Sequence, residues 1–162
     1  TIWYIHQPTS LTFKRRNKMR IQHTIEINAP IERVWDLTID VEALPDLTPT
    51  MTSVERLDDG PLAVGSQARI KQPAQGAKTW TVTALEPRKH FAWTTRAIGT
   101  RMTGGHHLEE SANGTTNTLT IDIEGALAPL VGLLLRLPIK SAIKKENEGF
   151  KTAAERQPIH SA

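Results

Sequence analysis

The chain has 162 residues, no cysteine and a formal charge of +3 at pH 7. The length suits a single domain, and the lack of cysteine excludes disulfides, thiolate metal sites and cysteine nucleophiles. A protein without cysteine is also typical of the cytoplasm, where we expect this one to be soluble. The longest apolar run, residues 125–135, is far shorter than the ~20 residues of a membrane-spanning helix, so we expect no transmembrane segment.

The positive charge is concentrated at the N-terminus. Residues 1–18 hold four basic side chains and no acidic one, whereas the remaining chain carries 16 basic and 17 acidic side chains. A nucleic-acid-binding domain would carry its basic side chains on the fold itself, so we expect no nucleic-acid partner. Met19 directly precedes the first strand pattern, and we therefore interpret residues 1–19 as a dispensable basic leader, disordered or not native. A basic arm for a membrane surface or a nucleic acid is the alternative.

The first elements are one strand and two helices. Side chains alternate between apolar and polar over residues 21–27, which predicts a half-buried strand. Pro30 suits the first turn of a helix, and apolar side chains recur at helical spacing from Ile31 to Thr38. A short second helix is predicted for residues 41–47.

From residue 51 onward the pattern has a period of two. Asn113-Gly114 is a strong signal for a β-hairpin, and short turns between all these strands indicate an antiparallel meander. We expect the first strand to join the same sheet, and the threonine-rich outward positions to face water. The six further strands are predicted at residues 51–57, 66–72, 78–85, 90–96, 100–110 and 116–125.

The C-terminal part is helical. Two apolar stripes run from Leu127 to Leu134 and from Ile139 to Ala154, and Pro138 between them predicts a kink or a break near the start of the longer segment. Residues 157–162 are interpreted as a tail. The predicted fold class is α+β, a curved seven-stranded antiparallel sheet wrapped around a long C-terminal helix. One helix rarely fills the concave face of such a sheet, so we predict a cavity between them for an apolar small molecule.

The predicted cavity residues are inward-facing on the strands or apolar on the helix. Aromatic rings at such positions offer flat faces to a ring-bearing or long-chain ligand, although the same residues are equally typical of an ordinary core. We expect four leucines of the helix to form the opposite wall or the mouth of the cavity, namely Leu130, Leu133, Leu134 and Leu137. The predicted ligand-binding residues are Trp80, Val82, Phe91, Trp93, Met102, Gly104, His106, Leu108, Ile121, Leu130 and Leu134.

One histidine is a candidate catalytic residue. His106 and His23 are the only ionisable side chains on the apolar sides of their strands, and an imidazole in a pocket is suited to general acid–base catalysis. The alternative is a histidine that is hydrogen-bonded within the core. His107 points to the face opposite His106, so the pair cannot chelate one ion, and we expect neither a metal nor a cofactor.

Several short motifs in a fixed order carry a resemblance to a known family. They are residues 27–37 (INAPIERVWDL), 40–45 (DVEALP), 60–65 (GPLAVG), 85–87 (LEP) with 91–93 (FAW), and 107–109 (HLE). In this order they resemble the SRPBCC superfamily (START-like, helix-grip fold), and within it the bacterial polyketide cyclase/dehydrase and lipid-transport-like group. The resemblance implies the order β-α-α-β6-α over residues 20–156, with an elongated pocket between the sheet and the C-terminal helix.

Three functions agree with this resemblance. The first is a binding protein, as a monomer or weak homodimer, for a lipid, quinone or polyketide-like compound. The second is a cyclase or dehydratase that uses His106 with a tyrosine, an aspartate or water; Tyr4, the only tyrosine, lies outside the predicted domain. The third is a protein-interaction module, which would show a shallow or filled pocket and an exposed apolar patch. A second polar side chain within hydrogen-bond reach of His106 would favour the enzyme.

Overall fold

The structure is a computed structural model that describes residues 18–73, 75–97 and 99–156. The seven strands form one antiparallel sheet in the order β1-β7-β6-β5-β4-β3-β2. The α+β fold class, the seven-stranded sheet and the long C-terminal helix predicted from the sequence are all confirmed. The elements are β1 (Lys18–Ile27), α1 (Ile31–Ile39), η1 (Val41–Ala43), α2 (Leu44–Leu47), β2 (Ser53–Arg56), β3 (Gln67–Lys71), β4 (Lys78–Glu86), β5 (His90–Ala97), β6 (Thr100–Ser111), β7 (Gly114–Gly125) and α3 (Ala128–Glu155).

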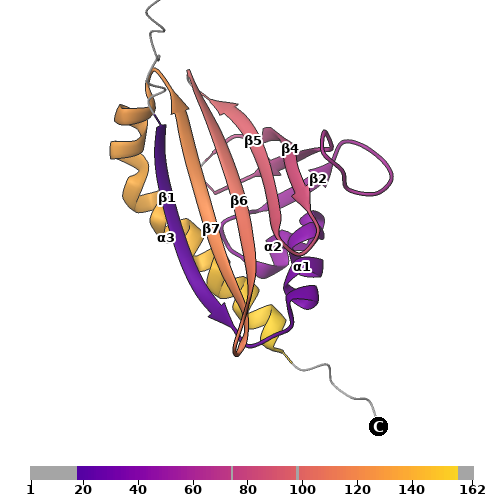
Figure 1. Ribbon diagram of the computed structural model, residues 1–162. Coiled ribbons are helices and arrows are strands. Elements are labelled where there is room, and N and C mark those ends of the chain that lie inside the picture. Colours follow the sequence, from indigo (N-terminus) through magenta and orange to yellow (C-terminus); the bar gives the residue numbers. More distant parts are fainter. Residues whose placement is uncertain (1–17, 74, 98, 157–162) are drawn as a thin grey trace, which may run out of the picture.

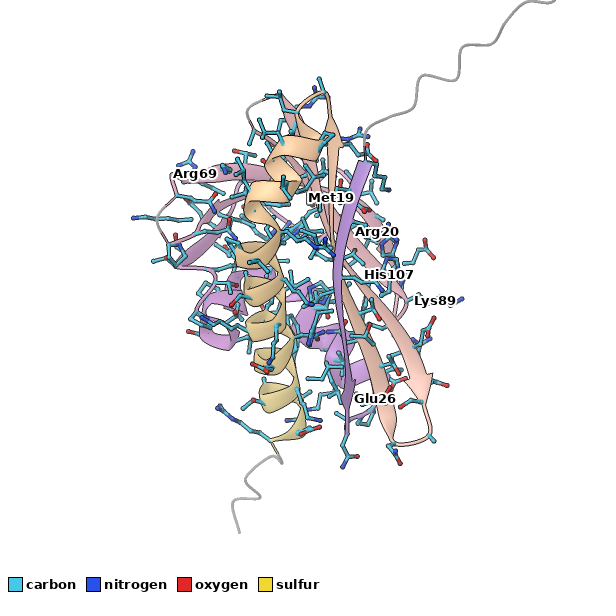
Figure 2. The ribbon with its side chains drawn as sticks, turned by 90° about the vertical axis from the view of Figure 1, so that its left-hand side faces the viewer. Met19, Arg20, Glu26, Arg69, Lys89 and His107 are labelled. Atoms are coloured by element: carbon cyan, nitrogen blue, oxygen red, sulfur yellow. The ribbon has the colours of Figure 1, made fainter. Side chains whose placement is uncertain are left out.

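All helices lie on one side of the sheet. The sheet bends around α3, and α1 and α2 lie beside the C-terminal half of that helix (Figure 1). Side chains of β1 alternate accordingly: Met19 faces α3, whereas Arg20 lies on the outer side of the sheet with His107 (Figure 2). The outer side therefore carries polar residues, as the alternation predicted, and the inner side carries the core.

The first strand begins earlier than residue 21, where its apolar alternation starts. Arg20 on β1 donates two hydrogen bonds of 2.7 Å to Asp122 on β7, and Lys18 lies 3.3 Å from the same carboxylate. Such pairs across neighbouring strands stabilise the ladder without any apolar pattern. Lys18 and Met19, which we had counted with the leader, thus belong to β1. The rest of the predicted leader and the predicted tail lie outside the described residues.

Of the kink or break predicted at Pro138, the break is wrong, because α3 continues through this residue as one helix of 28 residues. A proline inside a helix costs about 3 kcal/mol, since it removes one backbone hydrogen bond and crowds the preceding turn. The helix is held to the sheet on both sides of this position. Gly132 packs directly against Met19, and Ile143 and Phe150 are buried. This packing offsets the cost of the proline.

The core is concentrated under the C-terminal half of α3. Phe150 and Ala154 are buried there with Val34 and Trp35 of α1 and with the inward side chains of the central strands. The N-terminal half of the helix contributes far less, and most of its leucines are exposed. The space between that half and the sheet is therefore incompletely filled. In the part of the chain that the structure describes, no helix is long and apolar enough to cross a membrane.

Candidate functional site

A cavity of about 640 Å³ lies between α3 and the inner side of the sheet. Its sheet wall is formed by Trp80 of β4, Thr95 of β5, Met102 of β6 and Ile121 of β7. Each strand contributes its inward positions, because alternate side chains of a strand point to the same side. The exposed residues Gln75, Leu135 and Ser141 also line the cavity, and mark the side on which it meets solvent. The helix wall consists of Val131, Leu135, Pro138, Ile139, Ser141, Ala142, Ile143, Lys145 and Glu146.

Two tryptophans shape the inner wall. The rings of Trp80 and Trp93 lie 5.7 Å apart, and Phe91 meets Trp93 edge-on at 5.2 Å. Gly104 on the neighbouring strand makes room for the second indole, since a Cβ at that position would lie 3.1 Å from Nε1 of Trp93. A glycine in the middle of β6 therefore lets this ring pack closely against the strand.

A second, smaller cavity of about 50 Å³ adjoins the large one. The smaller one continues inward to Trp93 and His106, and the two share the lining residues Gln72, Trp80, Ile121, Ile143 and Glu146. His106 is 5% exposed and lies between two phenylalanines, with its ring centroid 4.8 Å from Phe150. It is thus a buried imidazole at the inner end of an apolar cavity.

His106 has an acidic partner on the helix. Its Nε2 lies 3.5 Å from Oε1 of Glu146, and both side chains are largely buried. The Nδ1 atom of His106 has no hydrogen-bond partner among the described residues. A carboxylate within reach of an imidazole nitrogen orients the ring, and the two groups together have the geometry that general acid–base chemistry uses. Glu146 lines both cavities, so a bound molecule could contact this pair.

The other inward histidine has a structural role. Nδ1 of His23 lies 3.2 Å from Nδ2 of Asn147, an amide that also donates to the carbonyls of His23 and Asn117. Asn117 donates back to Oδ1 of Asn147 over 3.0 Å, and both asparagines are fully buried. This network joins β1, β7 and α3. His23 lines neither cavity.

The predicted ligand-binding residues separate into three groups. Three of them line the large cavity, namely Trp80, Met102 and Ile121, and three more line the small one, namely Trp93, Gly104 and His106. Val82, Phe91 and Leu108 are buried in the core and line neither cavity.

The two helical residues of the prediction lie elsewhere. Leu130 and Leu134 are 56% and 67% exposed and line neither cavity. They lie on the side of α3 that points away from its buried residues, such as Gly132, and Val131 and Leu135 face the cavity instead. Of the two expected places, the wall or the mouth of the cavity, the wall is therefore wrong for Leu130 and Leu134.

Glu146 is the candidate site residue that sequence reasoning missed. A signal for it exists, because Glu146 lies three residues after Ile143 and four before Phe150, both of which are buried. Residues at this spacing share one face of a helix. A carboxylate on the apolar stripe of a helix needs a polar partner inside the fold, since burial of an unpaired charge is costly. The inward His106 is the partner that could have been inferred.

An open depression of mixed charge lies where the β4–β5 turn and β6 meet Ile31 of α1. His107 stacks there on His90, with centroids 4.1 Å apart and ring planes 10° apart. Burial, with the positive charges of His90 and Arg20, lowers the pKa of His107. Basic and acidic side chains alternate around the pair, from Glu86 and Arg88 to Glu109, so no single ligand charge is favoured. Among the described residues, no group of three or more His, Asp or Glu side chains is placed to hold a metal ion.

Known structures share this architecture. The chain matches a ginseng (Panax ginseng) major latex-like protein with a TM-score of 0.71, at 11% identity over 86% of this chain and 99% of the other. It matches the Zhui aromatase/cyclase from Streptomyces sp. R1128 with a TM-score of 0.61, at 20% identity over 85% and 91%. Such low identities establish the fold alone.

The match to a two-domain protein is partial. BexL, a di-domain aromatase/cyclase of the BE-7585A biosynthetic pathway, matches with a TM-score of 0.68 at 18% identity, over 87% of this chain but only 51% of the other. This chain thus spans about half of that protein. No curated protein matches significantly. The family model described as polyketide cyclase/dehydrase and lipid transport matches residues 18–155. With its helix-grip fold and its cavity between sheet and α3, the chain belongs to the polyketide cyclase/dehydrase and lipid transport family.

Proposed function

We propose that this protein binds an apolar small molecule, such as a lipid, a quinone or a polyketide-like compound, between the sheet and α3. The observation that carries the proposal is the cavity of about 640 Å³, walled by Trp80, Met102 and Ile121. This volume lies within the range of about 300–1,000 Å³ that is typical of small-molecule sites. A cavity with an apolar wall of this size favours a ligand with a ring system or an acyl chain.

The polar groups of the cavity further restrict which ligands fit it. His106 and Glu146 lie together at its inner end, whereas Lys78 and Lys145 contribute to the lining of the large cavity. A few polar groups in an apolar pocket set the orientation of the ligand. We therefore expect an apolar body with one hydroxyl group that donates a hydrogen bond to Glu146.

The test is a substitution that fills the cavity with a larger side chain, compared with the same substitution at a nearby exposed position of α3. Ala142 lines the large cavity, whereas Lys144, two residues further, is exposed and does not. Ala142→Phe should displace a co-purified molecule seen by native mass spectrometry, and should weaken binding of the fluorescent probe 1-anilinonaphthalene-8-sulfonate. Lys144→Phe, the matched control, should retain both. Equal loss in the two variants, or a wild-type protein that binds neither an endogenous molecule nor the probe, would contradict the proposal.

A second function is favoured by one specific observation. His106 has a carboxylate partner at 3.5 Å, which is the polar neighbour that acid–base chemistry requires. In a dehydration, the pair would remove a proton from the carbon beside a carbonyl and return one to the departing hydroxyl. The products are a carbon–carbon double bond and water. This makes a cyclase or dehydratase the alternative to a pure binding protein.

A direct assay separates binding from catalysis. A β-hydroxyketone probe that gives an absorbing enone on dehydration would report turnover. His106→Gln and Glu146→Gln should each lower the rate by about 10²- to 10⁴-fold, the usual contribution of a general acid or base, while binding of the anilinonaphthalene probe persists. An unchanged rate in His106→Gln would exclude it as the acid–base group. If the wild type did not turn the probe over, only the proposed binding function would remain.

A further inference from the structure

Four leucines are exposed on the N-terminal half of α3. Leu130, Leu133, Leu134 and Leu137 are 56%, 73%, 67% and 78% exposed, respectively. Their spacing of three and four residues places them on one side of the helix, which we call the leucine face. An apolar surface of this kind, contiguous and rimmed by polar residues, marks a site of interaction with a protein or a membrane.

The leucine face is flanked by positive charge alone. Residues 128–141 contain Arg136 and Lys140 and no acidic residue. Neither basic side chain forms an ion pair with any residue that the structure describes. The next lysine along the helix, Lys144, lies 3.7 Å from Glu148. The unpaired positive charges therefore coincide with the exposed leucines.

The leucine face also adjoins the cavity. Val131, Leu135 and Pro138 line the cavity from the neighbouring side of the same helical turns, and Leu135 is itself 41% exposed. Figure 1 shows this half of α3 at the end of the molecule where β1 begins, away from α1 and α2. A surface that covers the leucine face would therefore lie beside the opening of the cavity.

We propose that the leucine face binds the surface of an anionic lipid bilayer. An interfacial helix inserts its apolar side chains at the boundary between headgroups and acyl chains, and adds attraction between its basic residues and anionic headgroups. The leucines supply the first part here, and Arg136 and Lys140 supply the second. Docking does not depend on the proposed function. If the protein carries an apolar ligand, docking places the cavity where that ligand can enter or leave the bilayer.

The charges favour a bilayer over a second copy of the chain. A two-fold pair through the leucine face would bring Arg136 and Lys140 of both copies to one interface. Residues 128–141 offer no acidic side chain to neutralise them. Like charges at an interface oppose association, whereas an anionic headgroup layer neutralises all of them at once.

The test measures co-sedimentation of the full chain with vesicles. Wild type should sediment with vesicles of phosphatidylcholine and phosphatidylserine, and less with phosphatidylcholine alone or at high salt. Leu133→Glu with Leu137→Glu should lower the bound fraction by about tenfold or more, because it removes insertion and adds repulsion. Arg136→Gln with Lys140→Gln should lower it only for the anionic vesicles.

Val64→Glu is the matched control, since Val64 is 63% exposed but lies between β2 and β3, far along the chain from α3. It should bind vesicles like the wild type. All variants keep residues 1–17, so any contribution of their basic side chains is common to them. Circular dichroism and thermal unfolding verify the fold of each variant.

Two results would overturn the proposal. One is equal vesicle binding by wild type and by Leu133→Glu with Leu137→Glu. The other is a wild-type dimer, seen by light scattering, that these substitutions dissociate while no vesicle binding occurs. In that case a second copy of the chain covers the leucine face. Failure of the cavity-filling test alone would leave docking unaffected.

Discussion

The backbone carbonyl of Leu47 lies so close to Gly149 that a Cβ on this glycine would overlap the oxygen. Leu47 ends α2 and Gly149 lies in the C-terminal half of α3. The contact thus sets the distance at which the two helices pack. Because the neighbour is backbone, a rotation of a side chain does not relieve the overlap.

Gly149→Ala should therefore destabilise the protein. Alanine gains about 1 kcal/mol of helix propensity over glycine, but forced overpacking of a core costs about 1–3 kcal/mol, and backbone overlap belongs at the upper end. We expect a net loss of about 1–2 kcal/mol in the free energy of unfolding, measured by urea denaturation. Gly76→Ala is the control, because a Cβ there meets no atom within 4 Å. Equal stability of the two variants would show that the helices separate without cost.

Asn147→Leu should destabilise the protein through the buried network with Asn117 and His23. The substitution keeps the branched shape and the number of heavy atoms of the side chain but removes the donor and acceptor that these groups share. Each buried polar group left without a partner costs about 1–3 kcal/mol. Lys144→Leu, on the exposed side of the same helix, should change stability by less than about 0.5 kcal/mol. Chemical denaturation that gives similar values for both would contradict a structural role for the network.

Pro138→Ala should stabilise the protein. The substitution restores one backbone N–H in the interior of α3 and removes a clash, a gain of up to about 3 kcal/mol in an unconstrained helix. Pro138 is exposed on one side and lines the cavity on the other, so the substitution removes little packing. A rise in the melting temperature is expected. A fall would indicate that the proline ring supports the cavity wall.

Stability should decline in mild acid because of His107. Burial, together with His90 and Arg20, lowers the pKa of this imidazole below its ordinary value near 6.5. The unfolded chain then binds a proton more readily than the folded one as the pH falls from that value toward the lower folded pKa. His107→Gln should remove this part of the decline, as measured by the unfolding free energy at a series of pH values. An unchanged pH profile would exclude His107 as its source.

Asp122 should affect the pH dependence of stability in a separate and lower pH range than His107. Burial alone raises the pKa of its carboxyl, but hydrogen bonds from Arg20 and Lys18 outweigh burial and hold the pKa below its ordinary value. Its contribution to stability is therefore complete above about pH 4 and is lost as the pH falls through the folded pKa. Arg20→Gln should lower the free energy of unfolding above about pH 4 and make its decline below that pH less steep, as measured by urea denaturation at a series of pH values. The slope of the profile above pH 5 should change little, apart from the effect of Arg20 on His107.

Much of the sheet was predictable because strand alternation is a local property. Successive side chains of an extended chain point to opposite sides whatever packs around them. His106 could therefore be placed inward and His107 outward, and Trp80, Met102 and Ile121 could be assigned to the concave face. The charged start of β1 was missed, since ion pairs with Asp122 leave no apolar period to detect.

The amino-acid sequence by itself determined the order of the elements, the inner and outer sides of the strands and the presence of a long C-terminal helix. Only the tertiary structure decided how that helix is rotated. Apolar residues, among them Val131, Leu135 and Ile139 besides the leucine face, occur on most sides of its N-terminal half, so periodicity could not show which of them meet the sheet. Close contacts of Gly132 with Met19 and of Gly149 with Leu47 set the rotation. This rotation brings Glu146 to His106 and leaves the leucine face exposed, because contacts between distant segments, unlike alternation, are not a local property.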